Sequence, residues 1–363
     1  MVWSFRWALG WEEILQENYR AMWLSSVMDD DASGSTSPFF HPDVVMAWVE
    51  SMGGVDRVQP FFLQASSDSG GRAFLPLARL KTGWKQGWVR RLRPAGDRLF
   101  DYHDPSLSGT GQDGFWTELL DNIHQFEGNW YDELDLPRVR GAHLRDDTNW
   151  RLSDKSPFVR LDAYADFDAF LRSRPKSLRG DARRQIRRLS ETGEVAYRVH
   201  DRDGLSDVLN WIPDLERERE SKYPGARLPA GYLARLADSM SPNGPVHCSS
   251  ITLDGKSISW HIGFRWRGVM YWYVPIYDAA FSAWSPGKIH LYFAIEDAFR
   301  TGVHTFDFLR GQETYKAGWT DSEEFRMYGT GLQAGTPASL ARRGAAFALN
   351  KVGYARALLA ARK

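Results

Sequence analysis

The stretch that decides the fold runs from Val269 to Trp319 and contains, in order, VMYWYV (269–274), SPGK (285–288), TFDFL (305–309) and YKAGW (315–319). The first segment is rich in β-branched and aromatic residues, which predicts a buried strand. The proline and glycine of the second segment predict a turn that opens a helix. The third segment alternates and predicts another strand. Strand, helix and strand in this order indicate a parallel crossover, and ligands bind at the carboxyl ends of such strands.

The turn from Ser285 to Lys288 is the first candidate binding feature. A helix that begins at a glycine turn directs unpaired backbone N–H groups and the positive end of its dipole outward, which suits a phosphate-bearing donor. Proline near a helix start is also common for structural reasons alone. The strands on both sides favour the functional interpretation, so Ser285, Gly287 and Lys288 are the candidate cofactor-binding residues.

The residue order in this region resembles the GNAT-like acyltransferases of the cellulose and exopolysaccharide biosynthesis type, often called CelD-like. The residues that carry the resemblance are Tyr277-Asp278, Ser285-Pro286-Gly287, Glu296, Gly302, Asp307-Phe308, Gly311, Tyr315-Lys316 and Trp319. It extends upstream through the basic segment 178–189, and more loosely into the first half. The resemblance implies an α/β (α+β) fold of two tandem GNAT-like lobes, each a mixed, mostly antiparallel sheet flanked by helices. Fem-type peptidyltransferases share this arrangement.

The resemblance also implies an activity. Such an enzyme would move an acyl group from acetyl-CoA or another acyl-CoA to an amine or hydroxyl of a sugar or polysaccharide precursor. Gly109-Thr110-Gly111-Gln112-Asp113-Gly114 also fits a dinucleotide-binding pattern. The segment before it, 101–105, is polar and contains proline, whereas that motif requires a preceding buried strand. We therefore interpret 109–114 as a glycine-rich loop.

The length of 363 residues predicts two lobes, each able to bury a core. Hairpins recur in both halves, at 58–80 and at 246–274, and a polar stretch at 153–157 suggests the boundary. We expect an N-terminal lobe over 1–155, which helps to bind the acceptor, and a C-terminal acyltransferase lobe over 156–335. Residues 336–363 form a basic amphipathic pattern, a helix that docks on the protein or lies on an anionic membrane surface.

Composition excludes several classes of protein. Basic and acidic residues balance at 46 each, which argues against a protein whose main task is to wrap nucleic acid. No apolar run approaches the ~20 residues needed to cross a bilayer. The single cysteine, Cys248, permits no internal disulfide. The N-terminus lacks the features of a secretory signal, so we expect a cytoplasmic protein, with peripheral association at the inner membrane as an open alternative.

Acyl transfer requires a group that removes the proton of the nucleophile, and three side chains are candidates. Asp307 follows the strand that ends at the predicted donor site, and Lys316 lies nine residues beyond it. A nearby ammonium would keep the aspartate ionised, so these two are expected to act as a pair. His261 has a suitable ordinary pKa and lies on the more polar face of its predicted strand. Tyr315 is a candidate donor to the leaving thiolate.

In the N-terminal lobe, Asp101, Tyr102 and His103 match a family position that faces the cleft between lobes, and they are the candidate acceptor-binding residues. Two other classes of function stay open. The first is a Fem-type peptidyltransferase that uses aminoacyl-tRNA on a peptidoglycan precursor, with the basic helix from Arg179 to Arg188 as an RNA contact. The second is a non-catalytic scaffold of a polysaccharide assembly, since a fold does not fix function.

Overall fold

The computed structural model describes most of the chain. The described residues are 2–29, 37–80, 89–110, 114–123, 131–141, 144, 149–201, 204, 209–210, 212–213, 217, 228–311, 313–334, 336–338 and 340. The expected C-terminal helix over 336–363 lies almost entirely outside them, as do Gly111 to Asp113 of the glycine-rich loop. Among the described helices, none combines the length and the apolar character that spanning a membrane requires.

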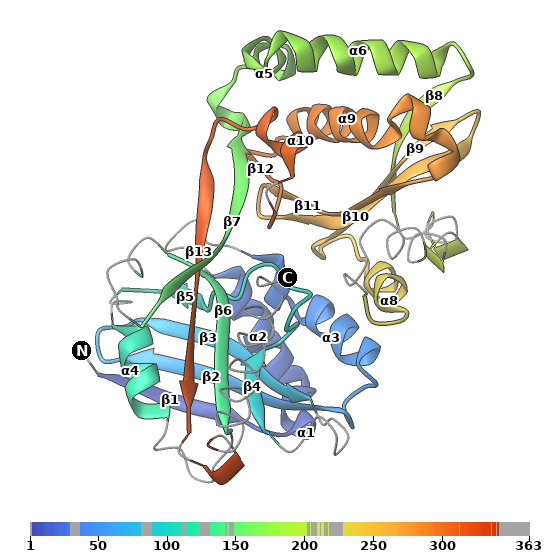
Figure 1. Cartoon of the computed structure of the whole chain (residues 1–363). Helices are drawn as coiled ribbons and strands as arrows, with labels where there is room; N and C mark the ends of the chain where they lie inside the picture. The colour runs from blue at the N-terminus through green and yellow to red at the C-terminus, as the bar shows by residue number, and fades with distance from the viewer. Residues whose placement is uncertain are drawn as a thin grey trace, which may run out of the picture.

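The N-terminal lobe is a sheet with helices on its faces (Figure 1). Apolar and polar residues alternate less strictly along its strands than in a sheet with one face exposed to solvent, because helices cover both faces. The elements are β1 (Trp3–Ala8), α1 (Trp11–Ile14), α2 (Glu17–Met28), the short helix Pro38–Phe40, α3 (Pro42–Ser51), β2 (Val58–Ser67), β3 (Arg72–Leu80), β4 (Arg91–Pro94), β5 (Ser106–Ser108), α4 (Phe115–Asn122) and β6 (Glu133–Arg140).

The C-terminal lobe repeats this plan, with α5, α6 and α9 along one face of its sheet and α8 near the other (Figure 1). Its elements are β7 (Arg151–Arg160), α5 (Phe167–Ser173), α6 (Lys176–Ser190), β8 (Val195–His200), α8 (Tyr232–Asp238), β9 (Val246–Leu253), β10 (Lys256–Trp266), β11 (Val269–Tyr277), the short helix Ala279–Trp284, α9 (Pro286–Arg300), β12 (Thr305–Asp307), α10 (Thr314–Ala317) and β13 (Glu324–Gln333).

The described strands form one continuous sheet of 13 strands, in the order β1-β2-β3-β4-β6-β13-β7-β12-β11-β10-β9-β8, with β5 beside β3. The two lobes meet at β7 and β13. Residues 153–157, expected as a polar connecting stretch, lie instead within β7 and pair with β13. The expected boundary near these residues stays a prediction; the polar side chains are compatible with a strand because β7 pairs with β13 and has little apolar cover. The expected fold class, a mixed sheet flanked by helices, is confirmed.

The parallel crossover predicted at the centre of the C-terminal lobe is present. β11 pairs in parallel with β12 from Val269 to Tyr271. Helix α9 connects the two strands and buries Ile289, Ala294 and Ile295 against the sheet. Because β12 is only three residues long, β11 continues past it to Tyr277 without a described strand partner on that edge. The two strands therefore separate at their carboxyl ends, where the sequence predicts the site.

An aromatic cluster fixes the two lobes against each other. Phe39, from the short helix of the N-terminal lobe, lies 5.3 Å from Phe264 and 5.7 Å from Tyr273 of the C-terminal sheet, between ring centroids. Helix α8 packs on α3 of the other lobe. Aromatic side chains bury large areas, so this interface holds the lobes in a defined orientation.

Candidate active site

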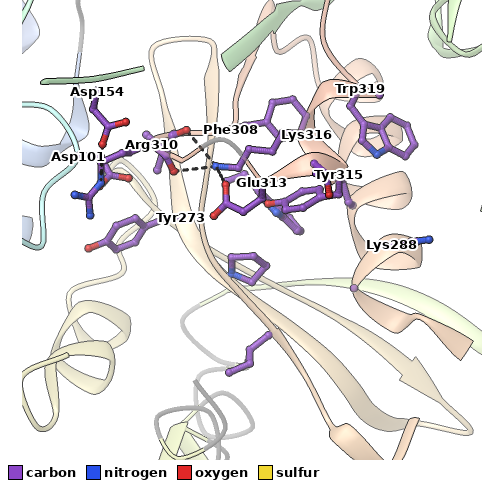
Figure 2. A pocket seen from close by; sticks show the side chains of 18 of the residues that line it. Asp101, Asp154, Tyr273, Lys288, Phe308, Arg310, Glu313, Tyr315, Lys316 and Trp319 are labelled. Atoms are coloured by element: carbon purple, nitrogen blue, oxygen red, sulfur yellow. Dashed lines mark hydrogen bonds and ion pairs between the residues drawn. The ribbon is translucent and has the colours of Figure 1, made fainter. Parts of the chain in front are cut away.

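A cavity of about 1470 Å³ lies between the lobes, at the point where β11 and β12 separate. One end is formed by the turn before α9, together with α6 and Tyr277. The other end is formed by the N-terminal lobe, including Asp101. Figure 2 shows Lys288 and Trp319 at one side of the view and Asp101 and Asp154 at the other, with Lys316 and Tyr315 between them. The cavity thus connects the predicted donor turn with the predicted acceptor lobe.

The turn before α9 leaves its first backbone N–H groups without a side-chain cap. Ser285 occupies the N-cap position with φ 54° and ψ 52°, in the left-handed region, and its side chain makes no capping hydrogen bond. An N-cap serine normally has extended backbone and accepts from an N–H of the first turn. Pro286 follows at the first helical position. Ser285 and Gly287 line the cavity, so this uncapped helix end faces it.

Gly287 also permits close packing at this turn. A Cβ atom there would lie 3.2 Å from Cδ1 of Tyr277. Lys288 lines the same end of the cavity, but its ammonium is already paired, because Nζ lies 2.8 Å from Oδ2 of Asp181 on α6. This contact with Lys288 is also the largest cause of the lowered pKa of Asp181. The expected donor-binding residues therefore come together, with the lysine joining α6 to α9.

The wall between the two ends is apolar at its centre. Trp272 and Trp319 are 3% and 4% exposed, so only their edges reach the cavity. Such a wall suits an acyl chain or a pantetheine-like arm better than a charged group. The other apolar lining residues include Leu178, Ile276, Leu291 and Phe308.

Lys316 is buried and holds the loop after β12. Its Nζ donates to the backbone carbonyls of Arg310 at 2.8 Å and of Leu309 and Gly311 at 3.3 Å. It also forms an ion pair of 2.8 Å with Glu313 (Figure 2). Lys316 is 4% exposed and lines the cavity. A lysine held by three carbonyls and a carboxylate fixes the shape of the loop that faces the ligand.

Asp307 lies beneath this loop and does not line the cavity. Tyr102 donates to its carboxylate, with distances of 2.9 and 2.8 Å to the two oxygens, and Ser156 Oγ donates at 3.1 Å. The N–H of Leu309 donates at 2.7 Å. Burial raises the pKa of Asp307 to about 6, against the opposing charge of Arg140. The predicted direct pair with Lys316 is not formed; both residues instead contact the same loop, at Leu309.

His261 also differs from the expectation that it is the general base at the cavity. It is fully buried, it stacks on Trp272 with 4.1 Å between ring centroids, and it is not among the residues that line the cavity. Its Nε2 accepts from the N–H of Tyr273, at a bulge between β10 and β11. Burial holds the pKa of His261 well below its usual range. The strand alternation placed it correctly on one face, but that face is covered by α9.

Of the three candidate acceptor-binding residues, only Asp101 lines the cavity. Its carboxylate lies 3.3 Å from Nε of Arg310, which also lies 3.8 Å from Asp154. Burial raises the pKa of Asp101, and Arg310 opposes this rise. Tyr102 is buried on Asp307, whereas His103 is buried with Nδ1 2.8 Å from the carbonyl oxygen of Pro137. Tyr102 is thus a structural contact between the lobes, whereas His103 packs within the N-terminal lobe.

Tyr315 projects from α10 into the cavity lining and is 37% exposed. Arg310 is a lining residue that sequence reasoning missed. The available signal was its place three residues after Asp307, in the loop that follows a parallel strand. Sequence reasoning missed Arg138 as well, because no residue type or spacing in the sequence indicated it. Its place depends on a strand irregularity that only the structure shows.

Strained backbone is concentrated at this cavity. Among the described residues, seven other than glycine have a positive φ, and four of these line the cavity: Asp97, Arg138, Ser285 and Leu309. Each such residue costs on the order of 1–3 kcal/mol and persists only where its surroundings enforce it. Two of the other three, Asp254 and Arg267, are in hairpin turns, where this conformation is ordinary. The distribution makes this cavity the candidate functional site.

Comparison with known proteins agrees with this geometry. Residues 176–317 match the family model described as an acetyltransferase (GNAT) domain. No protein of curated function has a significantly similar sequence. The expected exopolysaccharide-type assignment is not confirmed and stays a prediction.

Several solved structures share the fold. FemX has a TM-score of 0.54 at 11% identity, over 77% of this chain and 90% of that one. The C-terminal domain of a putative lysylphosphatidylglycerol synthetase from Agrobacterium fabrum has a TM-score of 0.54 at 11% identity, over 91% and 96%. A tandem GNAT protein from the clavulanic acid biosynthesis pathway has a TM-score of 0.50 at 12% identity, over 92% and 99%. Residues 176–317 are therefore similar to GNAT acetyltransferase domains, within a fold that a tandem GNAT protein and FemX share.

Proposed function

We propose that this protein transfers an acyl group from an acyl-CoA, in the first instance acetyl-CoA, to an amine or hydroxyl of a sugar or polysaccharide precursor. One observation carries the proposal: a single cavity joins the uncapped N-terminal turn of α9 to a charged wall on the other lobe. A transferase needs two substrates side by side, and this cavity provides two chemically different ends. The acceptor class rests on the resemblance to CelD-like acyltransferases.

The donor would bind at the turn before α9. The diphosphate of the donor would accept from the backbone N–H of Gly287, assisted by the helix dipole, whereas the N–H of Lys288 already donates to the carbonyl of Ser285 at 2.9 Å. Its acyl arm would lie along the apolar wall near Trp272 and Leu291. Polarisation of the acyl carbonyl is assigned to the backbone at the end of β11. Pro275 lines the cavity there, and because it lacks an N–H it interrupts the hydrogen bonding of the strand next to it.

The loop after β12 would set the position of the acceptor. Lys316 and Asp307 act as positioning residues, because each holds the backbone of this loop from a different side. Asp101 would accept a hydrogen bond from the acceptor nucleophile, since it is the buried carboxylate of the acceptor wall and its burial raises its pKa. Tyr315 would donate to the departing thiolate from the cavity wall.

A second function is supported by a different observation. Helix α6 lines the donor end of the cavity and carries an exposed basic face, which suits a nucleic-acid backbone. A Fem-type enzyme that takes aminoacyl-tRNA as donor and a peptidoglycan precursor as acceptor would use such a face. The basic residues of α6 are Lys176, Arg179, Arg183, Arg184, Arg187 and Arg188, of which Arg184 pairs with Asp181 and Arg187 with Glu191.

Thermal unfolding of the full chain with each donor separates these functions. A ligand that binds only the folded state stabilises it by about 2.7 kcal/mol at 100 times its dissociation constant. We expect acetyl-CoA or a longer acyl-CoA to raise the melting temperature, and charged tRNA to leave it unchanged. A rise with charged tRNA alone would replace the acyl-CoA proposal by the Fem-type one. No rise with any donor would favour the scaffold.

A further inference from the structure

Arg138 lies at a bulge in β6, and the bulge directs it to the cavity. Along the β6–β13 ladder, Leu136 pairs with Thr330 and Val139 with Tyr328, so β6 holds one more residue than its partner over this step. Arg138 has φ 59° there. Pro137 and Arg138 are consecutive, yet both line the cavity, which regular strand alternation would not allow. Bulges beside sites commonly re-aim a side chain in this way.

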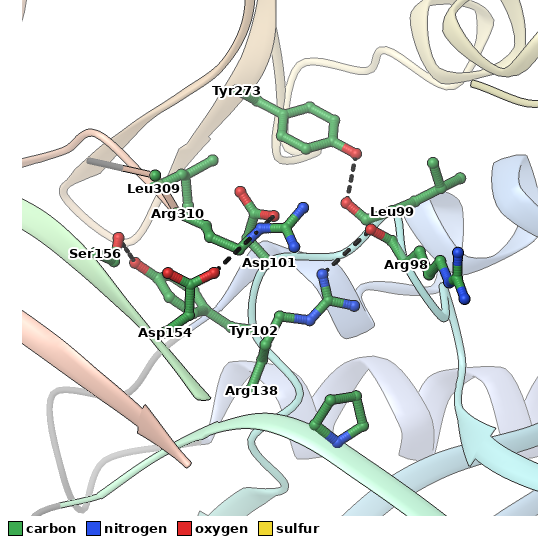
Figure 3. A network of polar contacts seen from close by, with 12 residues as sticks. Arg98, Leu99, Asp101, Tyr102, Arg138, Asp154, Ser156, Tyr273, Leu309 and Arg310 are labelled. Atoms are coloured by element: carbon green, nitrogen blue, oxygen red, sulfur yellow. Dashed lines mark hydrogen bonds and ion pairs between the residues drawn. The ribbon is translucent and has the colours of Figure 1, made fainter. Parts of the chain in front are cut away.

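The guanidinium of Arg138 is buried without a carboxylate partner. The side chain is 6% exposed, and it donates to the backbone carbonyls of Arg98 and Asp97 (Figure 3). No carboxylate of the described residues lies within ion-pair distance of it. A guanidinium has five N–H donors, so bonds to two carbonyls leave donors for another group. Burial lowers its pKa from the ordinary arginine value, which reflects the cost of keeping this charge there.

The neighbouring carboxylates are already engaged by two other arginines of the cavity wall. Each of these arginines bridges two carboxylates, which leaves both groups with a net negative charge. The pairs are Arg93 with Asp97 at 2.7 Å and Asp135 at 2.8 Å, and Arg310 with Asp101 at 3.3 Å and Asp154 at 3.8 Å. Arg138 therefore differs from both of these arginines, because it is buried at the same wall and has no ion pair with a described carboxylate.

Arg98 does not take this role. It is exposed, and Figure 3 shows its side chain extending away from Arg138, although its carbonyl accepts from Arg138. Asp101 and Arg310 lie on the other side of Arg138, toward the loop after β12 (Figure 3). The charge of Arg138 also acts on Asp101, whose pKa it lowers together with Arg310. A ligand that presents its nucleophile to Asp101 thus has Arg138 within reach of the rest of its skeleton.

We propose that Arg138 binds an anionic group of the acceptor, a phosphate or a carboxylate, so that the acceptor is an amine or alcohol carrying a negative charge. The inference rests on the proposed function in one respect only, that the acceptor occupies this end of the cavity. A planar guanidinium suits both anions, because its paired N–H groups match two oxygens at once.

The test compares three probes that share one skeleton: glucosamine, glucosamine 6-phosphate and glucosaminic acid. Their dissociation constants are measured by calorimetry on the full chain, without any acyl donor. We expect at least one anionic probe to bind about tenfold more tightly than glucosamine, as a charge-assisted hydrogen bond to arginine provides. The 6-phosphate and the acid separate a phosphate site from a carboxylate site. Equal affinities, or no binding by any probe, would overturn the proposal.

Variants show which residue is responsible for the preference for anionic probes. Arg138→Gln is expected to remove it, and Arg98→Gln, which alters an exposed arginine of the same wall, to keep it. Gly287→Leu obstructs the donor turn and is also expected to keep the preference for anionic probes. If the phosphate of a probe bound at α9 instead, Gly287→Leu would lose the preference. Arg138→Lys retains the charge without the fork and should keep a reduced preference. If Arg138→Gln does not fold, an undiminished preference in Arg138→Lys would contradict the proposal.

Because acetyl-CoA takes no part in this measurement, its outcome is independent of the donor experiment. A protein that binds acetyl-CoA but shows no preference for anionic probes would keep the proposed function and lose the anion site. If the protein shows a preference that depends on Arg138 but binds no acyl-CoA, the anion site would be kept and the proposed function lost.

Discussion

The two ends of the cavity present different chemical groups. At the proposed donor end, the turn before α9 presents the backbone N–H of Gly287, and the wall beside it is apolar. At the acceptor end, charged side chains such as Arg138, Arg310 and Asp101 supply the polar groups. Backbone recognition tolerates side-chain substitution, whereas side-chain recognition does not. Under the proposed function, the donor would be held mainly by backbone of the second lobe, and the acceptor by charged side chains from both lobes.

The largest effect is expected where a side chain blocks the backbone site. Gly287→Leu should abolish measurable acetyl-CoA binding, a loss above about 100-fold, because the new side chain enters the cavity and its Cβ lies 3.2 Å from Tyr277. Calorimetry with acetyl-CoA measures it. Gly180→Leu is the matched control, since a Cβ at that exposed position of α6 meets nothing within 4 Å. Wild-type affinity in Gly287→Leu would mean that the donor binds elsewhere.

A smaller effect is expected where the loop between the two ends is loosened. Lys316→Ala should lower turnover about 100-fold while acetyl-CoA affinity changes little, because displacement of a positioned loop by about 1 Å can cost that much. Glu313→Gln removes one of the contacts of Lys316 and keeps the three carbonyl bonds, so it should retain most of the activity. Steady-state kinetics with separate binding measurements distinguish the two parameters. Unchanged turnover in Lys316→Ala would remove the lysine from the mechanism.

Acid should weaken the packing of α9 against its sheet. Burial lowers the pKa of His247 from 6.5 to about 4, and both its ring nitrogens lack a hydrogen-bond partner among the described residues. Between these two pKa values, the unfolded chain therefore binds a proton at His247 more readily than the folded protein does. The free energy of unfolding consequently falls as pH falls from 7 toward 4, by about 3 kcal/mol for this residue. Asp307, with its pKa raised to about 6, partly offsets the loss.

Urea unfolding at pH 7 and pH 4 tests this expectation. His247→Gln, which cannot take up a proton, should lose about 3 kcal/mol less than the wild type on acidification. His304→Gln alters an exposed histidine and should follow the wild type. An identical acid loss in wild type and His247→Gln would show that the imidazole is not responsible.

The smallest effect separates two buried carboxylates. Asp101→Asn should lower kcat/KM for the acceptor about tenfold, since it weakens one charge-assisted hydrogen bond at the acceptor end. Asp307→Asn keeps a similar shape beneath the loop and should change kcat/KM less, while lowering the free energy of unfolding by about 1 kcal/mol. Kinetics and denaturant titration on both variants give the two quantities. A larger kinetic loss in Asp307→Asn than in Asp101→Asn would return the catalytic role to Asp307.

Local patterns in the sequence predict the centre of the C-terminal lobe well. Alternating and apolar runs give β11, β12 and the hairpins, and Pro286 with Gly287 gives the start of α9. These features depend on nearest neighbours along the chain, which a sequence displays directly. The parallel crossover then follows, because few connections of that order are possible.

The side chains of the site are less predictable, because burial and pairing depend on distant segments. His261 has the right face and the wrong environment, since α9 covers that face. Asp307 and Lys316 are both near the site, but the loop lies between them. Arg138 reaches the cavity through a bulge against β13, a strand almost 200 residues further along the chain. No local pattern encodes such a contact.

The position of β13 has a consequence for how the molecule is made. This strand, the last among the residues that the structure describes, lies between β6 and β7 and completes the sheet of the first lobe (Figure 1). A nascent chain that has not yet released residues 324–333 from the ribosome leaves the edges of β6 and β7 unpaired. The continuous sheet that joins the two lobes is therefore complete only after residues 324–333 have been released.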